Sequence, residues 1–133
     1  MTLAPFYAAP LFVKLHILAA LLVVALTPVQ FLGFSKGSPA HRTTGTLWLL
    51  AMVAVALTSL TMTSRFHLSI GGFGPIHLLS LLTLASCFWA WQAARRHEIT
   101  RHRLTLVLLT LSFFVAGAFT FLPGRIMHRI IAG

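Results

Sequence analysis

The sequence predicts an all-α membrane protein, namely a four-helix up-down-up-down transmembrane bundle with a short C-terminal interfacial segment. Three observations lead to this prediction. The 133 residues are 58% hydrophobic and only 8% charged, whereas soluble domains carry about a quarter charged residues. The apolar residues gather in four long runs, and the connections between these runs are short. No stretch is left for a second domain, so residues 1–133 are expected to form one four-span domain.

Each run is long enough to cross a bilayer, for which a helix needs about 20 apolar residues. The predicted spans are Leu11–Phe34, Thr44–Ser64, Pro75–Ala94 and Arg103–Leu122. The first run is too long for the apolar part of a signal peptide and no small-residue cleavage site follows it, so we expect it to be retained. Short connections make consecutive spans antiparallel neighbours. The tail "GRIMHRIIAG" is too short to span and suits the membrane interface.

The charged residues indicate how the spans are oriented. Ten Lys and Arg stand against one acid, Glu98, for a net charge of +9. They lie scattered at the ends of the apolar runs, which is typical of a lipid-facing protein rather than of a nucleic-acid surface. One side of the bundle holds six of them (Lys36, Arg42, Arg95, Arg96, Arg101, Arg103) and the other holds four (Lys14, Arg65, Arg125, Arg129). By the positive-inside rule the first side is cytoplasmic and both termini are periplasmic.

Four of the seven histidines lie in the first turns of the four spans, one in each span. His16 and His41 are 25 residues apart, and so are His77 and His102. The segments "HRTTGTLWLL" and "HRLTLVLLTL", which start at His41 and His102, share five of ten residues and indicate a weak internal repeat. The remaining three histidines are expected at the membrane interface: His67, His97 and His128.

The regular placement of these four histidines predicts haem ligands. In a bundle with neighbours in order, spans one and three lie diagonally, as do spans two and four. His16 then faces His77 across one half of the bundle, and His41 faces His102 across the other half. A haem iron in such a bundle takes one imidazole on each face of the porphyrin. The expected cofactors are therefore two b-type haems.

Three arginines are candidate partners for the haem propionates. Arg42 and Arg103 each follow a predicted ligand directly in the chain, and guanidinium groups bind carboxylates through strong bidentate hydrogen bonds. Arg125, in "FLPGR", ends the last span and could bind a propionate, a quinone oxygen or a lipid phosphate.

Other chemistry is disfavoured. A single acid outside the spans leaves no carboxylate for a Ser-His-Asp set or for an intramembrane proton relay. Zinc or copper sites are disfavoured because no two histidines share a helix face four residues apart, and Cys87 has no second cysteine. The small residues below the histidines leave room for a porphyrin edge, but small residues also let membrane helices pack closely without any cofactor.

Two resemblances arise at these residues. The segments "PAHRTTGTLW", "GPIHLLSLLTL" and "VAGAFTFLPGRIMH" resemble those of a family of small four-helix bacterial membrane proteins, a domain of unknown function. This resemblance covers nearly the whole chain and implies the bacterial inner membrane, but no activity. The histidine pattern is also similar to that of transmembrane di-haem cytochromes b of the ascorbate-reducible class. That resemblance implies the same two histidine pairs, although this chain has only four helices and no ascorbate-binding basic motif.

The sequence is compatible with two functions. The first is a quinone-linked membrane oxidoreductase that carries electrons between quinone and a partner on the opposite face of the membrane. The second is a non-catalytic accessory subunit or assembly factor without cofactor. Partners besides the lipid bilayer are expected to be a second copy of the chain or a larger membrane complex, and no nucleic acid.

Overall fold

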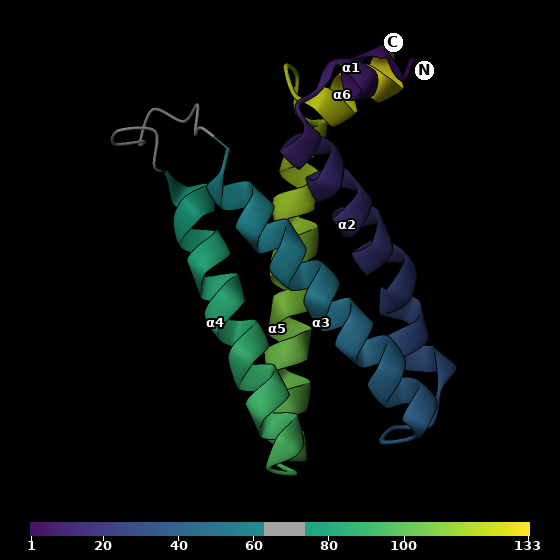
Figure 1. Cartoon of the computed structure of the whole chain (residues 1–133), viewed down its shortest axis with the longest axis vertical. Coiled ribbons are helices and arrows are strands. Elements are labelled where there is room, and N and C mark those ends of the chain that lie inside the picture. The colour runs from purple at the N-terminus through teal and green to yellow at the C-terminus, as the bar shows by residue number, and fades with distance from the viewer. Residues whose placement is uncertain (63–73) are drawn as a thin grey trace.

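A computed structural model describes residues 1–62 and 74–133 (Figure 1). Within these residues four helices are long and apolar enough to cross a membrane, which confirms the predicted fold class. They are α2 (Leu11–Pro28), α3 (Pro39–Leu60), α4 (Pro75–Arg95) and α5 (Ile99–Ala118). Short segments extend two of them, η1 (Val29–Gly33) and η2 (Phe119–Phe121), and two further short helices are α1 (Ala4–Ala8) and α6 (Ile126–Ala132). Arg65 and His67 lie outside the described residues.

The second and fourth spanning helices begin before their apolar runs. Helix α3 starts at Pro39 because the Ser38 hydroxyl accepts a hydrogen bond from the backbone N–H of His41 (3.2 Å) and proline fits the first helical position. It ends at Leu60. Helix α5 starts at Ile99, so its first turn is polar. Hydropathy detects only the part of a helix that sits in hydrocarbon, whereas capping determines where the helix begins.

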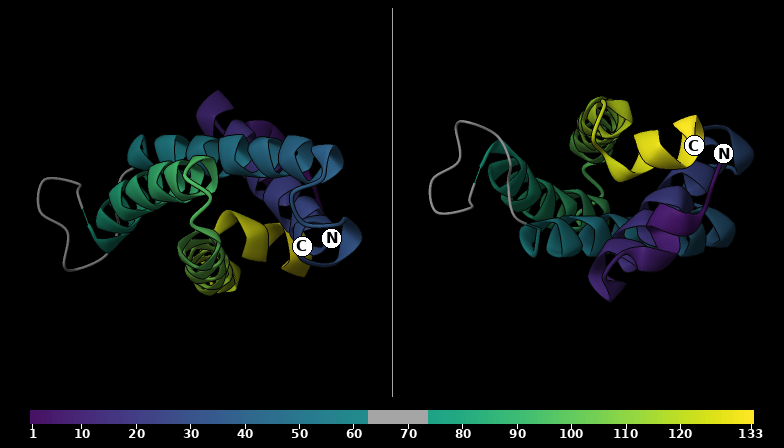
Figure 2. Two further views of the ribbon diagram at one scale, coloured as in Figure 1. Left: turned by 90° about the horizontal axis from the view of Figure 1, so that it is seen from below. Right: turned by 90° about the horizontal axis from the view of Figure 1, so that it is seen from above.

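The long helices pack in chain order, α2 on α3, α3 on α4 and α4 on α5. Among the described residues α2 and α5 make no extended contact, unlike the pairs of spans that follow one another in the chain (Figures 1 and 2). We call the end with both chain termini the terminal end, and the end with the 34–38 and 96–98 turns the turn end. At the terminal end α1 packs on α6, and the backbone N–H of Thr2 donates to the carbonyl of Ile130 (3.0 Å).

The core lies at the centre of the bundle and takes residues from every span. Val23, Trp48, Cys87 and Leu109 are almost completely buried there and pack together with Met52 and Ala51. The Trp48 ring N–H donates to the Thr27 hydroxyl (3.0 Å), so the one polar atom of the ring is satisfied. Many large apolar side chains outside this core are exposed, as expected for helices whose outer faces contact lipid.

A polar contact at the turn end holds α2 against α3. After Pro28 the chain continues as the single π-helical turn η1, which places Gln30 against the start of α3. The side-chain amide of Gln30 donates to the Thr44 hydroxyl, and the Lys36 ammonium donates to the backbone carbonyl of Gln30. Gly45 makes this approach possible, because a Cβ there would lie 3.0 Å from the Gln30 Oε1 atom. The α2–α3 hairpin is therefore closed by a buried amide rather than by apolar side chains alone.

Candidate functional site

A large apolar cavity occupies the half of the bundle near the terminal end. We call it the terminal cavity. Its volume is about 610 Å³, and all four spanning helices line it together with Thr120, Phe121 and Met127. The polar side chains among its lining residues are few: His16, Ser59, Ser80, Thr83, Ser112 and Thr120. Among the described residues, α2 and α5 both line the cavity without extended contact with one another.

His16 lines this cavity and is held by the C-terminal half of α3. Its Nδ1 atom lies 3.1 Å from the Val55 carbonyl and 2.9 Å from the Thr58 hydroxyl. The hydroxyls of Thr58 and Ser59 each donate to a carbonyl one turn back, of Ala54 (2.6 Å) and Val55 (2.8 Å) respectively. Because those protons are used, the ring must be the donor. We therefore assign the proton to Nδ1, which leaves a lone pair on Nε2.

His77, the expected partner of His16, is bound differently. Its Nε2 donates to the Met62 carbonyl (2.7 Å), and its Nδ1 accepts from the backbone N–H of Gly74 (3.1 Å). The side chain is buried and does not line the terminal cavity. Both ring nitrogens are thus engaged, and the ring ties the end of α3 to the start of α4. Pairing of His16 with His77 on one iron stays a prediction that requires this ring to leave both partners.

The two other histidines, His41 on α3 and His102 on α5, lie at the turn end of the bundle. The Nδ1 of His102 donates to the Ala90 carbonyl (2.8 Å), since a carbonyl can only accept, and Nε2 therefore keeps its lone pair. The Nδ1 of His41 is the one buried side-chain nitrogen or oxygen without a hydrogen-bond partner in the described part of the chain. Figure 1 shows α3 diverging from α4 toward this end, which separates the starts of α3 and α5.

The candidate arginines lie at both ends of the bundle. Arg42 and Arg103 are exposed at the turn end, each beside one of these histidines. The ion pair that the described residues contain joins Arg101 to Glu98 (2.9 Å), which is the sole acidic side chain of the sequence. The guanidinium groups of Arg42 and Arg103 therefore have no acidic side chain to bind. Arg125 lies at the terminal end, where it precedes α6.

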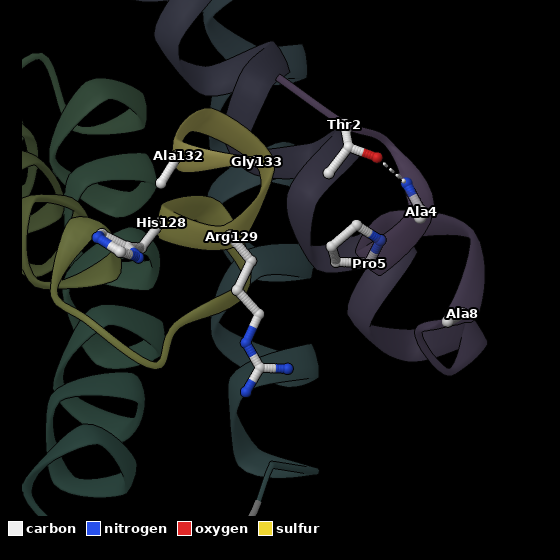
Figure 3. Close-up of a pocket in the computed structure, with 8 residues that line it drawn as sticks. All are labelled: Thr2, Ala4, Pro5, Ala8, His128, Arg129, Ala132 and Gly133. Atoms are coloured by element: carbon white, nitrogen blue, oxygen red, sulfur yellow. Dashed lines mark hydrogen bonds between the residues drawn. The ribbon is translucent and has the colours of Figure 1, made fainter.

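A second hollow lies between α1 and α6 (Figure 3). Its lining is mostly small side chains, with His128 and Arg129 as its only ionisable groups. These two side chains point in different directions in Figure 3, and the Thr2 hydroxyl accepts from the Ala4 N–H (3.3 Å). Since no polar groups converge there, this hollow is not a candidate site.

The sequence did not predict the hydrogen bonds that the rings of His16, His77 and His102 make with the backbone. In the described residues no three His, Cys, Asp or Glu side chains converge as a metal site would require, although a haem iron needs only two imidazoles. The signal that could have identified His77 is its position three residues after Gly74, where a side chain can bind back to the helix start. His97 lies in the α4–α5 turn with a positive φ of 57° and lines neither candidate site.

The family model described as "Predicted membrane protein (DUF2306)" matches residues 13–121. The chain belongs to this family. The match includes all of the spanning helices except the first two residues of α2, and it includes the four histidines near their starts, whereas Arg125 lies beyond it. No curated protein and no solved structure matches the chain. Membership of this family establishes a multi-pass membrane protein and carries no activity with it.

Proposed function

We propose that this DUF2306 protein is a membrane redox protein that holds a b-type haem at the turn end, between His41 and His102, and exchanges electrons with quinones in the bilayer. The observation that supports this most is the buried Nδ1 of His41, which lacks a hydrogen-bond partner at the end of the bundle where His102 keeps a lone pair on Nε2. Leaving a buried polar atom unsatisfied costs about 1–3 kcal/mol. A bond from Nδ1 to iron would offset that cost.

The surrounding residues fit such a group. The Ala90 carbonyl holds the His102 ring in one tautomer, and metal-binding histidines are commonly oriented in this way by a second hydrogen bond. Arg42 and Arg103 lie at the same end and are available for two propionates. When bound, haem supplies one-electron redox chemistry. The chain would orient the two imidazoles and balance the propionate charge with the two arginines. The packed core at the centre of the bundle would exclude water from the site.

The second haem of the sequence prediction involves His16 and His77. Its formation requires His77 to release both Met62 and Gly74, so we propose the turn-end site as the first to fill.

We also propose that the turn end lies on the cytoplasmic side of a bacterial inner membrane. Six of the ten Lys and Arg residues lie there, and cytoplasmic loops are enriched in these residues.

Absorption spectroscopy tests the haem proposal. The full-length protein is purified in detergent after expression with added haem precursor, and its spectrum is recorded before and after dithionite. We expect a Soret band that shifts on reduction, and we expect His41→Ala and His102→Ala to lose it. His128→Ala, which removes a histidine at the terminal end, is the matched control and should keep the band. Colourless protein would overturn the proposal and favour an accessory subunit without cofactor.

A further inference from the structure

We propose that the terminal cavity binds a hydroquinone, the reduced form of a lipid-soluble quinone, through a hydroxyl group that donates to Nε2 of His16. This inference deepens the proposed function, on which it rests for the identity of the redox partner. It is carried by the hydrogen-bonding character of the cavity wall, which is independent of whether haem is present.

The wall of the terminal cavity offers acceptors and few donors. Nε2 of His16 carries a lone pair because Nδ1 donates to α3. The hydroxyl protons of Ser59, Ser80 and Thr120 are all used by backbone carbonyls of their own helices, those of Val55 (2.8 Å), Ile76 (2.8 Å) and Gly117 (2.6 Å). Each hydroxyl oxygen therefore presents lone pairs to the cavity. The hydroxyls of Thr83 and Ser112 have no such acceptor among the described residues, so they can donate as well as accept. A ligand with hydrogen-bond donors can therefore bind all six polar side chains, whereas a ligand that only accepts can bind two of them.

The apolar part of the cavity wall restricts the chemical class of the ligand. Most lining residues are apolar, among them Ala20, Leu79 and Phe113. A polyol would lose its hydration without replacement bonds in such surroundings. A cationic amine is costly inside a membrane and has no carboxylate here to pair with. A neutral aromatic ring with one or two hydroxyl groups supplies hydrogen-bond donors and also fits the apolar wall.

Access to the cavity favours a ligand dissolved in the bilayer. Helices α2 and α5 line the cavity and make no extended contact in the described residues, so we expect a flat ring to enter from the lipid between them. Hydroquinones are such molecules, and their hydroxyls donate to the wall. The oxidised quinone carries only carbonyl acceptors, which can accept from Thr83 and Ser112 but leave Nε2 of His16 without a donor. We therefore expect the cavity to prefer the reduced form.

Equilibrium dialysis of the full-length protein in detergent, under anaerobic conditions, tests this selection. The probes are 2,3-dimethyl-1,4-naphthohydroquinone kept reduced with dithionite and its 1,4-dimethoxy ether, which has the same ring without donors. We expect the hydroquinone to bind roughly tenfold more tightly, as the loss of one or two hydrogen bonds would give. Equal binding of the two probes would overturn the proposal and indicate a cavity filled by lipid chains.

Variants locate the bound probe. His16→Phe removes the acceptor and should lower hydroquinone affinity to that of the ether, whereas His128→Phe should leave it unchanged. Because His16 also holds α3, a second pair is needed: Ala20→Trp fills the cavity and should abolish binding, while Leu18→Trp on the exposed face of α2 should not. Binding that survives Ala20→Trp would contradict the proposed location.

The haem and cavity proposals can fail separately. Dialysis needs no chromophore in the protein, so colourless protein that still prefers the hydroquinone would refute only the haem. His41→Ala should lose the Soret band and retain hydroquinone binding. A red protein that binds both probes equally would refute only the cavity proposal.

Discussion

The terminal end and the turn end each contain two histidines at the starts of spanning helices, and the two ends use them differently. At the terminal end His16 and His77 both bind carbonyls near the C-terminal end of α3, at Val55 and Met62. At the turn end His102 binds Ala90 on the adjacent helix α4, and His41 keeps a buried nitrogen without a partner. A histidine repeated at equivalent sequence positions can therefore hold helices together in one half and remain available in the other.

The largest expected effect concerns haem content. If the turn end is the haem site, His41→Ala should remove essentially all haem, whereas His77→Ala should remove none. The pyridine haemochrome assay, expressed per chain, measures this and should give one haem for the unsubstituted protein. Two haems per chain, with one lost in His77→Ala, would instead show that the terminal end binds haem as well.

A second all-or-none difference between the ends is the side of the membrane they face. Gly37 lies in the turn-end loop with a positive φ of 81° and open space around it. In a Cys87→Ala background, Gly37→Cys should react with a membrane-impermeant maleimide only in inside-out vesicles. Thr2→Cys, at the terminal end, should react only in right-side-out vesicles. The opposite pattern would reverse the predicted orientation.

The histidines should also differ in their contribution to stability. His77→Ala removes two hydrogen bonds from a buried ring and should lower the free energy of unfolding by about 2 kcal/mol. In haem-free protein His41→Ala removes an unsatisfied atom and should change stability by less than about 1 kcal/mol. Denaturant unfolding in mixed micelles, followed by circular dichroism, compares the two. Equal destabilisation would contradict the assignment of His77 as the structural residue.

The smallest effects concern two helical glycines. Gly45→Val at the turn end places a branched side chain against the Gln30 Oε1 atom and should cost about 1–2 kcal/mol. Gly117→Ala at the terminal end meets nothing within 4 Å and should stabilise the helix by up to about 1 kcal/mol. The same unfolding assay measures both. A neutral Gly45→Val would show that η1 is not held tightly against α3.

The sequence was sufficient to predict the four spans, their order of packing and a histidine in the first turn of three of them, whereas His16 lies in the second turn of α2. Hydropathy and short connections determine these features. It was not sufficient to predict what each ring contacts. The two bonds of His77 depend on where α3 ends relative to α4, and Met62 lies beyond the last helical residue of α3.

The sequence pattern did not predict the terminal cavity either. Small residues such as Ala20 and Ala116 are compatible with close helix packing or with an open space. Only the lack of extended contact between α2 and α5, as observed in the described residues, distinguishes the two arrangements. The acceptor character of the wall follows from hydroxyls bonded within their own helices, which a sequence motif does not specify.

Electron paramagnetic resonance of the oxidised full-length protein tests the central claim most directly. Two imidazoles from His41 and His102 on one iron predict a low-spin ferric signal, and removal of either ring predicts the loss of this signal together with the haem. A haem whose low-spin signal is unchanged in both His41→Ala and His102→Ala would contradict the account.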